Sequence, residues 1–134
     1  MVFPRIAVVD DDPDLLQLVD EIFLERGWNL LPFVDGGDFL EFIEHELPDA
    51  VVLDLHLGTI ESGWDVLGML RSDARTQNVP VIIWSADLHH LGNREFWLME
   101  QGIGILPKPF DLSAFYTSIE TALASRVAVA PIEE

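Results

Sequence analysis

Five short runs of apolar residues alternate along the chain with stretches in which apolar residues recur at helical spacing. The runs cover residues 6–9, 28–33, 50–53, 81–84 and 103–106. They are nearly continuous rather than alternating, which is typical of strands covered on both faces. Strand and helix patterns follow one another in order, so the sequence predicts an α/β fold: a (βα)5 doubly wound, five-stranded parallel sheet with helices on both sides.

The helical stretches carry start and stop signals. Asp12 can cap the first helix, Pro13 suits its first position, Gly27 can end it, and Asp111 can cap the last helix. A Gly-Asn pair interrupts the stretch 86–101, so the fourth helix is expected to be the least regular. The apolar faces are expected to be Leu15, Leu18, Val19, Ile22 and Phe23 in the first helix, Phe39, Phe42, Ile43 and Leu47 in the second, Trp64, Val66, Leu67 and Leu70 in the third, and Leu112, Phe115, Ile119 and Leu123 in the last.

The length of the chain indicates its number of domains, and its charge excludes some classes of binding partner. A chain of 134 residues has the length of one domain, expected over residues 1–126, with a flexible C-terminal tail over residues 127–134. Its 24 acidic residues against 7 basic ones give a formal charge of -17, which repels nucleic acid and anionic membrane surfaces. We therefore expect no direct DNA binding and no membrane binding.

The absence of cysteine fits a reducing compartment. The longest apolar runs are far shorter than the roughly 18 residues needed to span a bilayer. The N-terminal residues lack the basic and apolar layout of a signal peptide. The sequence thus predicts a cytoplasmic protein.

Polar side chains that could bind a ligand or take part in a reaction lie where the predicted strands end. In an open doubly wound sheet, sites form beyond the carboxyl ends of the strands. Carboxylates gathered there repel one another unless a cation neutralises them, and a hard divalent ion with oxygen ligands, above all Mg2+, meets that need. The residues concerned are Asp10, Asp11 and Asp12 after the first strand, Asp54 after the third, Ser85 after the fourth and Lys108 after the fifth.

Lys108 is the only lysine of the chain. Its ammonium group can pair with Asp54 before a reaction and with a phosphoryl oxygen afterwards, while the Ser85 hydroxyl can donate to another oxygen of the same group. A carboxylate nucleophile, a divalent cation, a hydroxyl and an ammonium are sufficient for phosphoryl transfer to Asp54, because positioning and charge neutralisation supply most of the catalysis.

The chain resembles the receiver domains of response regulators from residue 5 to about residue 125. It carries the four signature segments of that family in order: VVDDDP at residues 8–13, VVLDL at 51–55, VIIWSA at 81–86 and KPF at 108–110. The resemblance implies a flavodoxin-like receiver fold, a cis peptide bond between Lys108 and Pro109, and a stand-alone receiver of two-component signalling. It implies a phosphoprotein that is no enzyme, although it assists its own Mg2+-dependent phosphorylation and dephosphorylation.

The resemblance also implies a role for each site residue. Asp54 would be the phosphoacceptor, and Ser85 and Lys108 would bind the phosphoryl group. The metal ligands would be Asp10, Asp11 and Asp54, directly or through water, with the backbone carbonyl of His56.

The partners follow from the same resemblance. A sensor histidine kinase or a histidine phosphotransfer protein would supply the phosphoryl group, and a downstream protein target would receive the signal. Phosphorylation would remodel the face made by the fourth helix, fifth strand and fifth helix, which is also a possible homodimer face. Whether the protein relays the phosphoryl group or docks on a target is left open.

Three features depart from the family pattern. Ile105 replaces the usual aromatic switch residue, so we expect output to travel through the backbone of residues 85–93 or through Trp84. The loop after Asp54 has Gly58 where proline is usual, and its glycine, Gly63, comes one position late. His56 and Asp87 stand where this family tunes the lifetime of the aspartyl phosphate.

Two alternatives remain at this stage. One is a receiver-like interaction module that is not phosphorylated, which Ile105 and the altered loop favour. The other is a phosphatase of the haloacid-dehalogenase type, whose nucleophile motif needs a second aspartate where this chain has His56. The other histidines are expected to be exposed, and the tryptophans are expected to pack in or near the core or, with Phe96, to form a partner face.

Overall fold

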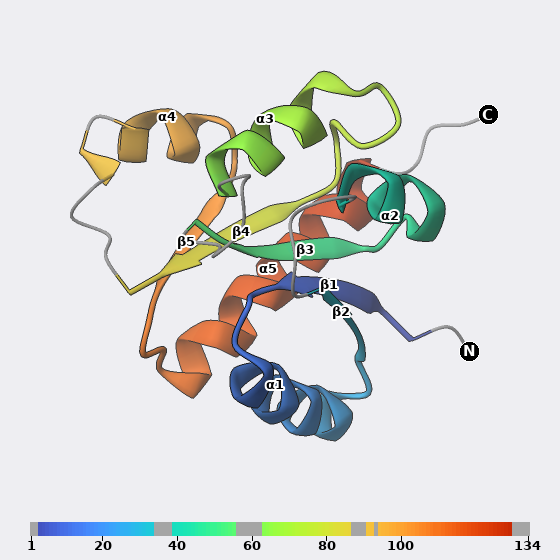
Figure 1. Cartoon of the computed structure of the whole chain (residues 1–134), viewed down its shortest axis with the longest axis vertical. Coiled ribbons are helices and arrows are strands. Elements are labelled where there is room, and N and C mark those ends of the chain that lie inside the picture. The colour runs from blue at the N-terminus through green and yellow to red at the C-terminus, as the bar shows by residue number, and fades with distance from the viewer. Residues whose placement is uncertain (1–2, 34–38, 56–62, 87–90, 93, 130–134) are drawn as a thin grey trace.

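A computed structural model describes residues 3–33, 39–55, 63–86, 91–92 and 94–129. Five parallel strands form one sheet in the order β2-β1-β3-β4-β5 (Figure 1). The strands are β1 (Arg5–Val9), β2 (Asn29–Phe33), β3 (Ala50–Asp54), β4 (Val81–Ser85) and β5 (Gly104–Pro107). The helices are α1 (Pro13–Arg26), α2 (Phe39–Glu46), α3 (Gly63–Ser72), α4 (Arg94–Glu100) and α5 (Leu112–Val129). The predicted fold class is confirmed.

The sheet is covered on both faces, as the continuous apolar runs predicted. Helices α2, α3 and α4 lie on one side of it, and α1 and α5 lie on the other (Figure 1). Along β1, Ala7 and Val9 point into the core with α2, α3 and α4, whereas Ile6 and Val8 point into the core with α1 and α5. Every position from Ile6 to Val9 is therefore apolar, because both faces of the strand are buried there.

The predicted ends of α1 are confirmed. The Asp12 side chain accepts hydrogen bonds from the backbone N–H groups of Asp14 (3.0 Å) and Leu15 (3.4 Å). Gly27 ends the helix with a φ of 73°, a left-handed conformation that glycine adopts without steric cost. This cap directs the chain into β2 at the edge of the sheet.

Three residues expected on apolar helix faces are on the surface: Leu18, Leu47 and Leu112, the last of which is 44% exposed at the start of α5. Leu18 is 48% exposed, and Leu16 is buried in its place, because Leu16, Val19 and Phe23 form the stripe that faces the sheet. Leu47 is 47% exposed with a φ of 47°, since α2 ends one residue before it.

The C-terminal helix is longer than expected. It continues to Val129, so residues 127–129 are helical rather than part of a tail. Residues 130–134 lie outside the described part of the chain. Across the described residues, none of the helices combines the length and apolar character that crossing a bilayer requires.

Candidate functional site

Three carboxylates meet at the carboxyl ends of β1 and β3. Asp10, Asp11 and Asp54 each place an oxygen within 4.8 Å of the other two, and we call them the acidic cluster. Asp10 and Asp54 are buried, at 1% and 5% exposure, while Asp11 faces solvent. The structure thus brings together the three aspartates that the sequence singled out, because β1 and β3 are neighbours in the sheet.

Backbone contacts fix the position of Asp10. Its own N–H donates to the carbonyl of Phe33 at 3.1 Å, which ties the end of β1 to the end of β2. Its Oδ1 accepts a hydrogen bond of 2.9 Å from the N–H of Asp12. Oδ1 is therefore engaged by the chain itself, and Oδ2 faces Lys108.

Lys108 joins two members of the acidic cluster. Its Nζ lies 2.5 Å from Oδ2 of Asp10 and 3.2 Å from Oδ2 of Asp54. The sequence predicted the pairing with Asp54, whereas the shorter contact with Asp10 is a finding of the structure. The cis peptide bond between Lys108 and Pro109 is confirmed.

The acidic cluster changes the acidity of Lys108. Burial by itself lowers the pKa of this ammonium, but the hydrogen bonds and negative charges of Asp10 and Asp54 together hold the pKa above its ordinary value of 10.5. Lys108 is therefore cationic at physiological pH. One ammonium does not balance three carboxylates, and the remaining negative charge on oxygen donors fits a hard divalent cation such as Mg2+.

Ser85 ends β4 beside the lysine. It is fully buried, and its backbone carbonyl accepts a hydrogen bond of 2.9 Å from the N–H of Lys108. Asp54 and Trp84 are register partners across β3 and β4. The strand ends therefore hold Ser85, Asp54 and Lys108 in one neighbourhood.

Several expected residues lie outside the described part of the chain. These are the loop residues His56 and Gly58, Asp87, and two of the histidines, His89 and His90. Ile105, in place of the usual aromatic residue, is partly buried in β5, where its register partner is Ile83. His45 is exposed, as expected.

Two residues near the site have roles that the sequence did not reveal. Gly63, the first residue of α3, lies against the backbone of Asp54, where a Cβ would come within 2.3 Å of the Asp54 carbonyl oxygen. Trp84, expected to pack in the core or to transmit output, has the Lys108 ammonium over the face of its ring. The late glycine in the loop after Asp54 was the only sequence signal for Gly63.

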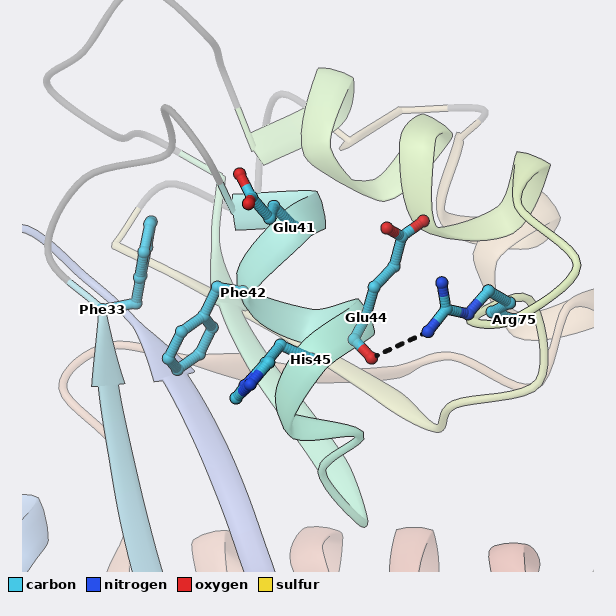
Figure 2. Close-up of a pocket in the computed structure, with 6 residues that line it drawn as sticks. All are labelled: Phe33, Glu41, Phe42, Glu44, His45 and Arg75. Atoms are coloured by element: carbon cyan, nitrogen blue, oxygen red, sulfur yellow. Dashed lines mark hydrogen bonds between the residues drawn. The ribbon is translucent and has the colours of Figure 1, made fainter.

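A separate hollow of about 510 Å³ lies at the β2 edge, between α2 and the segment after α3 (Figure 2). Within it, Nη2 of Arg75 donates to the backbone carbonyl of Glu44 at 3.4 Å (Figure 2). Its lining residues are Phe33, Glu41, Phe42, Glu44, His45 and Arg75. None of them belongs to the acidic cluster or to the other predicted site residues.

The fold and the site define a class of protein: a doubly wound α/β domain with an acidic cluster and a lysine at the carboxyl ends of its strands. The family model of the response regulator receiver domain matches residues 6–120, and the chain belongs to this family. It is accordingly a signalling module of two-component systems.

Individual proteins support this assignment. The transcriptional regulatory protein PrrA of Mycobacterium tuberculosis is 32% identical over 123 residues, which cover 92% of this chain and 51% of PrrA. The chain thus spans about half the length of that curated relative.

Solved structures share the fold. A sensor protein from Polaromonas sp. JS666 has a TM-score of 0.80 and 26% identity, covering 92% of this chain and 98% of that one. The receiver domain of the sensor histidine kinase PA1611 from Pseudomonas aeruginosa PAO1, with a magnesium ion in its active site cleft, has a TM-score of 0.79 and 21% identity, covering 92% of this chain and 99% of that one.

Proposed function

We propose that Asp54 is the residue of this receiver domain that accepts the phosphoryl group. The observation that carries the proposal is the contact of Lys108 with both Asp10 and Asp54 inside a cluster of three carboxylates. A nucleophilic carboxylate and a mobile cation beside it are the groups that phosphoryl transfer requires. Asp54 ends the central strand β3, between Asp10, which follows β1, and Ser85, which ends β4.

The reaction is a displacement at phosphorus. A carboxylate oxygen of Asp54 attacks the phosphorus of the donor, and the bond from phosphorus to the leaving group breaks. When the donor is a phosphohistidine, the imidazole leaves with the electron pair, and when it is acetyl phosphate, acetate leaves. The Lys108 ammonium then exchanges the Asp54 carboxylate for a phosphoryl oxygen, and the Ser85 hydroxyl donates to a second one.

Asp10, Asp11 and Asp54, with the backbone carbonyl of His56, are the residues that would hold Mg2+. When bound, the ion neutralises negative charge that the chain's single lysine does not balance. The magnesium ion of the PA1611 receiver domain supports this assignment by analogy of fold.

The proposed donor is a sensor histidine kinase or a histidine phosphotransfer protein, and the proposed output is binding to a downstream protein target. The face of α4, β5 and α5 is the proposed output surface and the possible homodimer face. Phe96 and Trp97 of α4 are 69% and 45% exposed, which supports a partner at this surface.

Intact mass spectrometry tests the phosphoacceptor proposal. Wild-type protein with acetyl phosphate and Mg2+ is expected to gain one phosphoryl group that is stable to acid and labile to base. The gain should vanish in Asp54→Asn, persist in Asp20→Asn, which changes an exposed aspartate of α1, and fall when Mg2+ is chelated.

Two other outcomes would contradict the proposal. Absence of any labelling of the wild type would favour the interaction module that is not phosphorylated. Continuous phosphate release from unrelated phosphate monoesters would favour the phosphatase.

A further inference from the structure

The ring of Trp84 lies beside the ammonium group of Lys108. The Nζ atom of Lys108 sits over the indole at 5.0 Å from the ring centroid, within the range of a cation–π interaction. Trp84 is fully buried and precedes Ser85 in β4. In the described part of the chain, the ammonium of Lys108 thus contacts the carboxylates of Asp10 and Asp54 and lies over the face of Trp84.

Packing alone gives no reason for an indole at this position. The buried Nε1 of Trp84 has no hydrogen-bond partner among the described residues, and a buried donor without a partner is destabilising. A phenylalanine would fill much of the same space without that donor. An indole offers a larger and more electron-rich face, which attracts a cation more strongly than a benzene ring does.

Neighbouring aromatic rings fix the orientation of that face. Trp84 stacks on Phe110 with ring centroids 5.9 Å apart and on Phe115 with centroids 5.7 Å apart. Phe110 and Phe115 also contact each other, with centroids 4.7 Å apart. Phe110 and Phe115 thus lie together against the indole and restrict it, whereas the lysine stem has several rotatable bonds.

We propose that Trp84 is a positioning residue that holds the ammonium of Lys108 between Asp10 and Asp54. This inference rests on the proposed phosphorylation of Asp54, in which Lys108 moves to a phosphoryl oxygen. The two carboxylates engage two of the three N–H donors of the ammonium, and the ring face attracts its positive charge. The ring therefore restricts where the ammonium lies while leaving donors for the carboxylates before the reaction and for the phosphoryl oxygens afterwards.

The single lysine makes the contact directly observable. Protein labelled with 13C-lysine gives one ε-CH2 resonance for the whole chain, that of Lys108. In unphosphorylated wild type, the ring current of Trp84 is expected to move the ε protons upfield of their position in free lysine. The displacement should shrink in Trp84→Phe, nearly vanish in Trp84→Leu, and stay unchanged in Trp28→Phe, which alters a buried tryptophan just before the amino end of β2.

The rate of phosphorylation by acetyl phosphate, measured on the same proteins with Mg2+, tests the consequence. From the usual strength of a cation–π contact, we expect a rate about three- to tenfold lower in Trp84→Leu and about twofold lower in Trp84→Phe. Trp28→Phe should match the wild type. If Trp84→Leu does not fold, the graded response of Trp84→Phe carries the test.

Three outcomes would overturn the inference. An unmoved Lys108 resonance in the Trp84 variants would exclude the contact, and a moved resonance with wild-type rates would exclude a role in the reaction. Failure of the wild type itself to be phosphorylated would overturn the proposed function and with it the reaction role of Trp84, and the Lys108 resonance would show whether the contact exists independently.

Discussion

Gly63 leaves no room for a side chain next to the backbone of Asp54. A Cβ on Gly63 would lie 2.3 Å from the Asp54 carbonyl oxygen and 2.6 Å from the Cα of Leu55. The N–H of Gly63 also donates to the carbonyl of Leu55 at 3.2 Å. The first residue of α3 therefore rests directly on the strand end that carries the proposed phosphoacceptor.

Gly63→Ala is expected to destabilise the fold and to slow phosphorylation. The clash is with backbone, so α3 or the end of β3 must move, and overpacking of this kind costs about 1–3 kcal/mol. Gly68→Ala is the matched control in the same helix, because a Cβ there meets nothing within 4 Å, and a gain of about 0.5–1 kcal/mol is expected. Urea unfolding measures both, and equal effects of the two substitutions would refute the close approach.

Mg2+ is expected to stabilise the folded protein through the acidic cluster. An ion that binds only the folded state raises its stability by mass action, by about 2.7 kcal/mol at a hundred times the dissociation constant. The thermal midpoint of the wild type should rise with Mg2+ concentration, whereas Asp10→Asn and Asp54→Asn should respond weakly. Mg2+ can also stabilise the protein by screening its overall charge of -17. Asp20→Asn, which removes a carboxylate outside the acidic cluster, is the control for that general effect. The same rise in all four proteins would argue against a specific site.

Glu46 is expected to make stability depend on pH in the acid range. A hydrogen bond from His45 lowers the pKa of Glu46 below its ordinary value of 4.5; slight burial opposes this, and the Arg5 guanidinium adds to the lowering. A carboxyl whose pKa is depressed by folding contributes stability above its unfolded pKa and loses that contribution as pH falls through the folded pKa.

The Glu46→Gln variant should therefore have a lower urea midpoint than the wild type near neutral pH, and the two midpoints should converge as the pH falls below 4.5. Glu21→Gln, on the exposed side of α1, is the matched control. A difference that grows toward acid pH would reverse the assigned direction of the pKa shift.

Leu98 is expected to anchor α4. It is the buried residue of this seven-residue helix, whereas its neighbour Phe96 is 69% exposed. Leu98→Ala should lower the free energy of unfolding by about 2–5 kcal/mol, and Phe96→Ala should change it by less than about 0.5 kcal/mol. Urea unfolding followed by far-UV circular dichroism measures both, and a larger loss in Phe96→Ala would mean that α4 packs through its other face.

The sheet could be predicted from the sequence, because strands buried on both faces appear as continuous runs of apolar residues. Residues of β1 such as Ile6 and Ala7 are apolar on alternate faces, and all five predicted runs are strands. The buried faces of the helices were harder to predict from the sequence. Leu16 and Leu18 are both apolar, and only the position of α1 over the sheet decides that Leu16 is buried.

The residues of the site could be predicted, because the carboxyl ends of parallel strands lie at the same edge of the sheet. The distances within it were not. That Lys108 lies closer to Asp10 than to Asp54 depends on side-chain packing. The orientation of Trp84 depends likewise on its contacts with Phe110 and Phe115. The helical pattern predicted that Phe115 faces the core, but not which ring it meets.

Locating the phosphoryl group in the chain tests the central claim most directly. Borohydride reduces an aspartyl phosphate to homoserine, which peptide sequencing by mass spectrometry identifies at a single position. After treatment with acetyl phosphate and Mg2+, the account predicts homoserine at position 54 and unmodified aspartate at positions 10 and 11. Homoserine at position 10 or 11, or its absence from a phosphorylated protein, would contradict it.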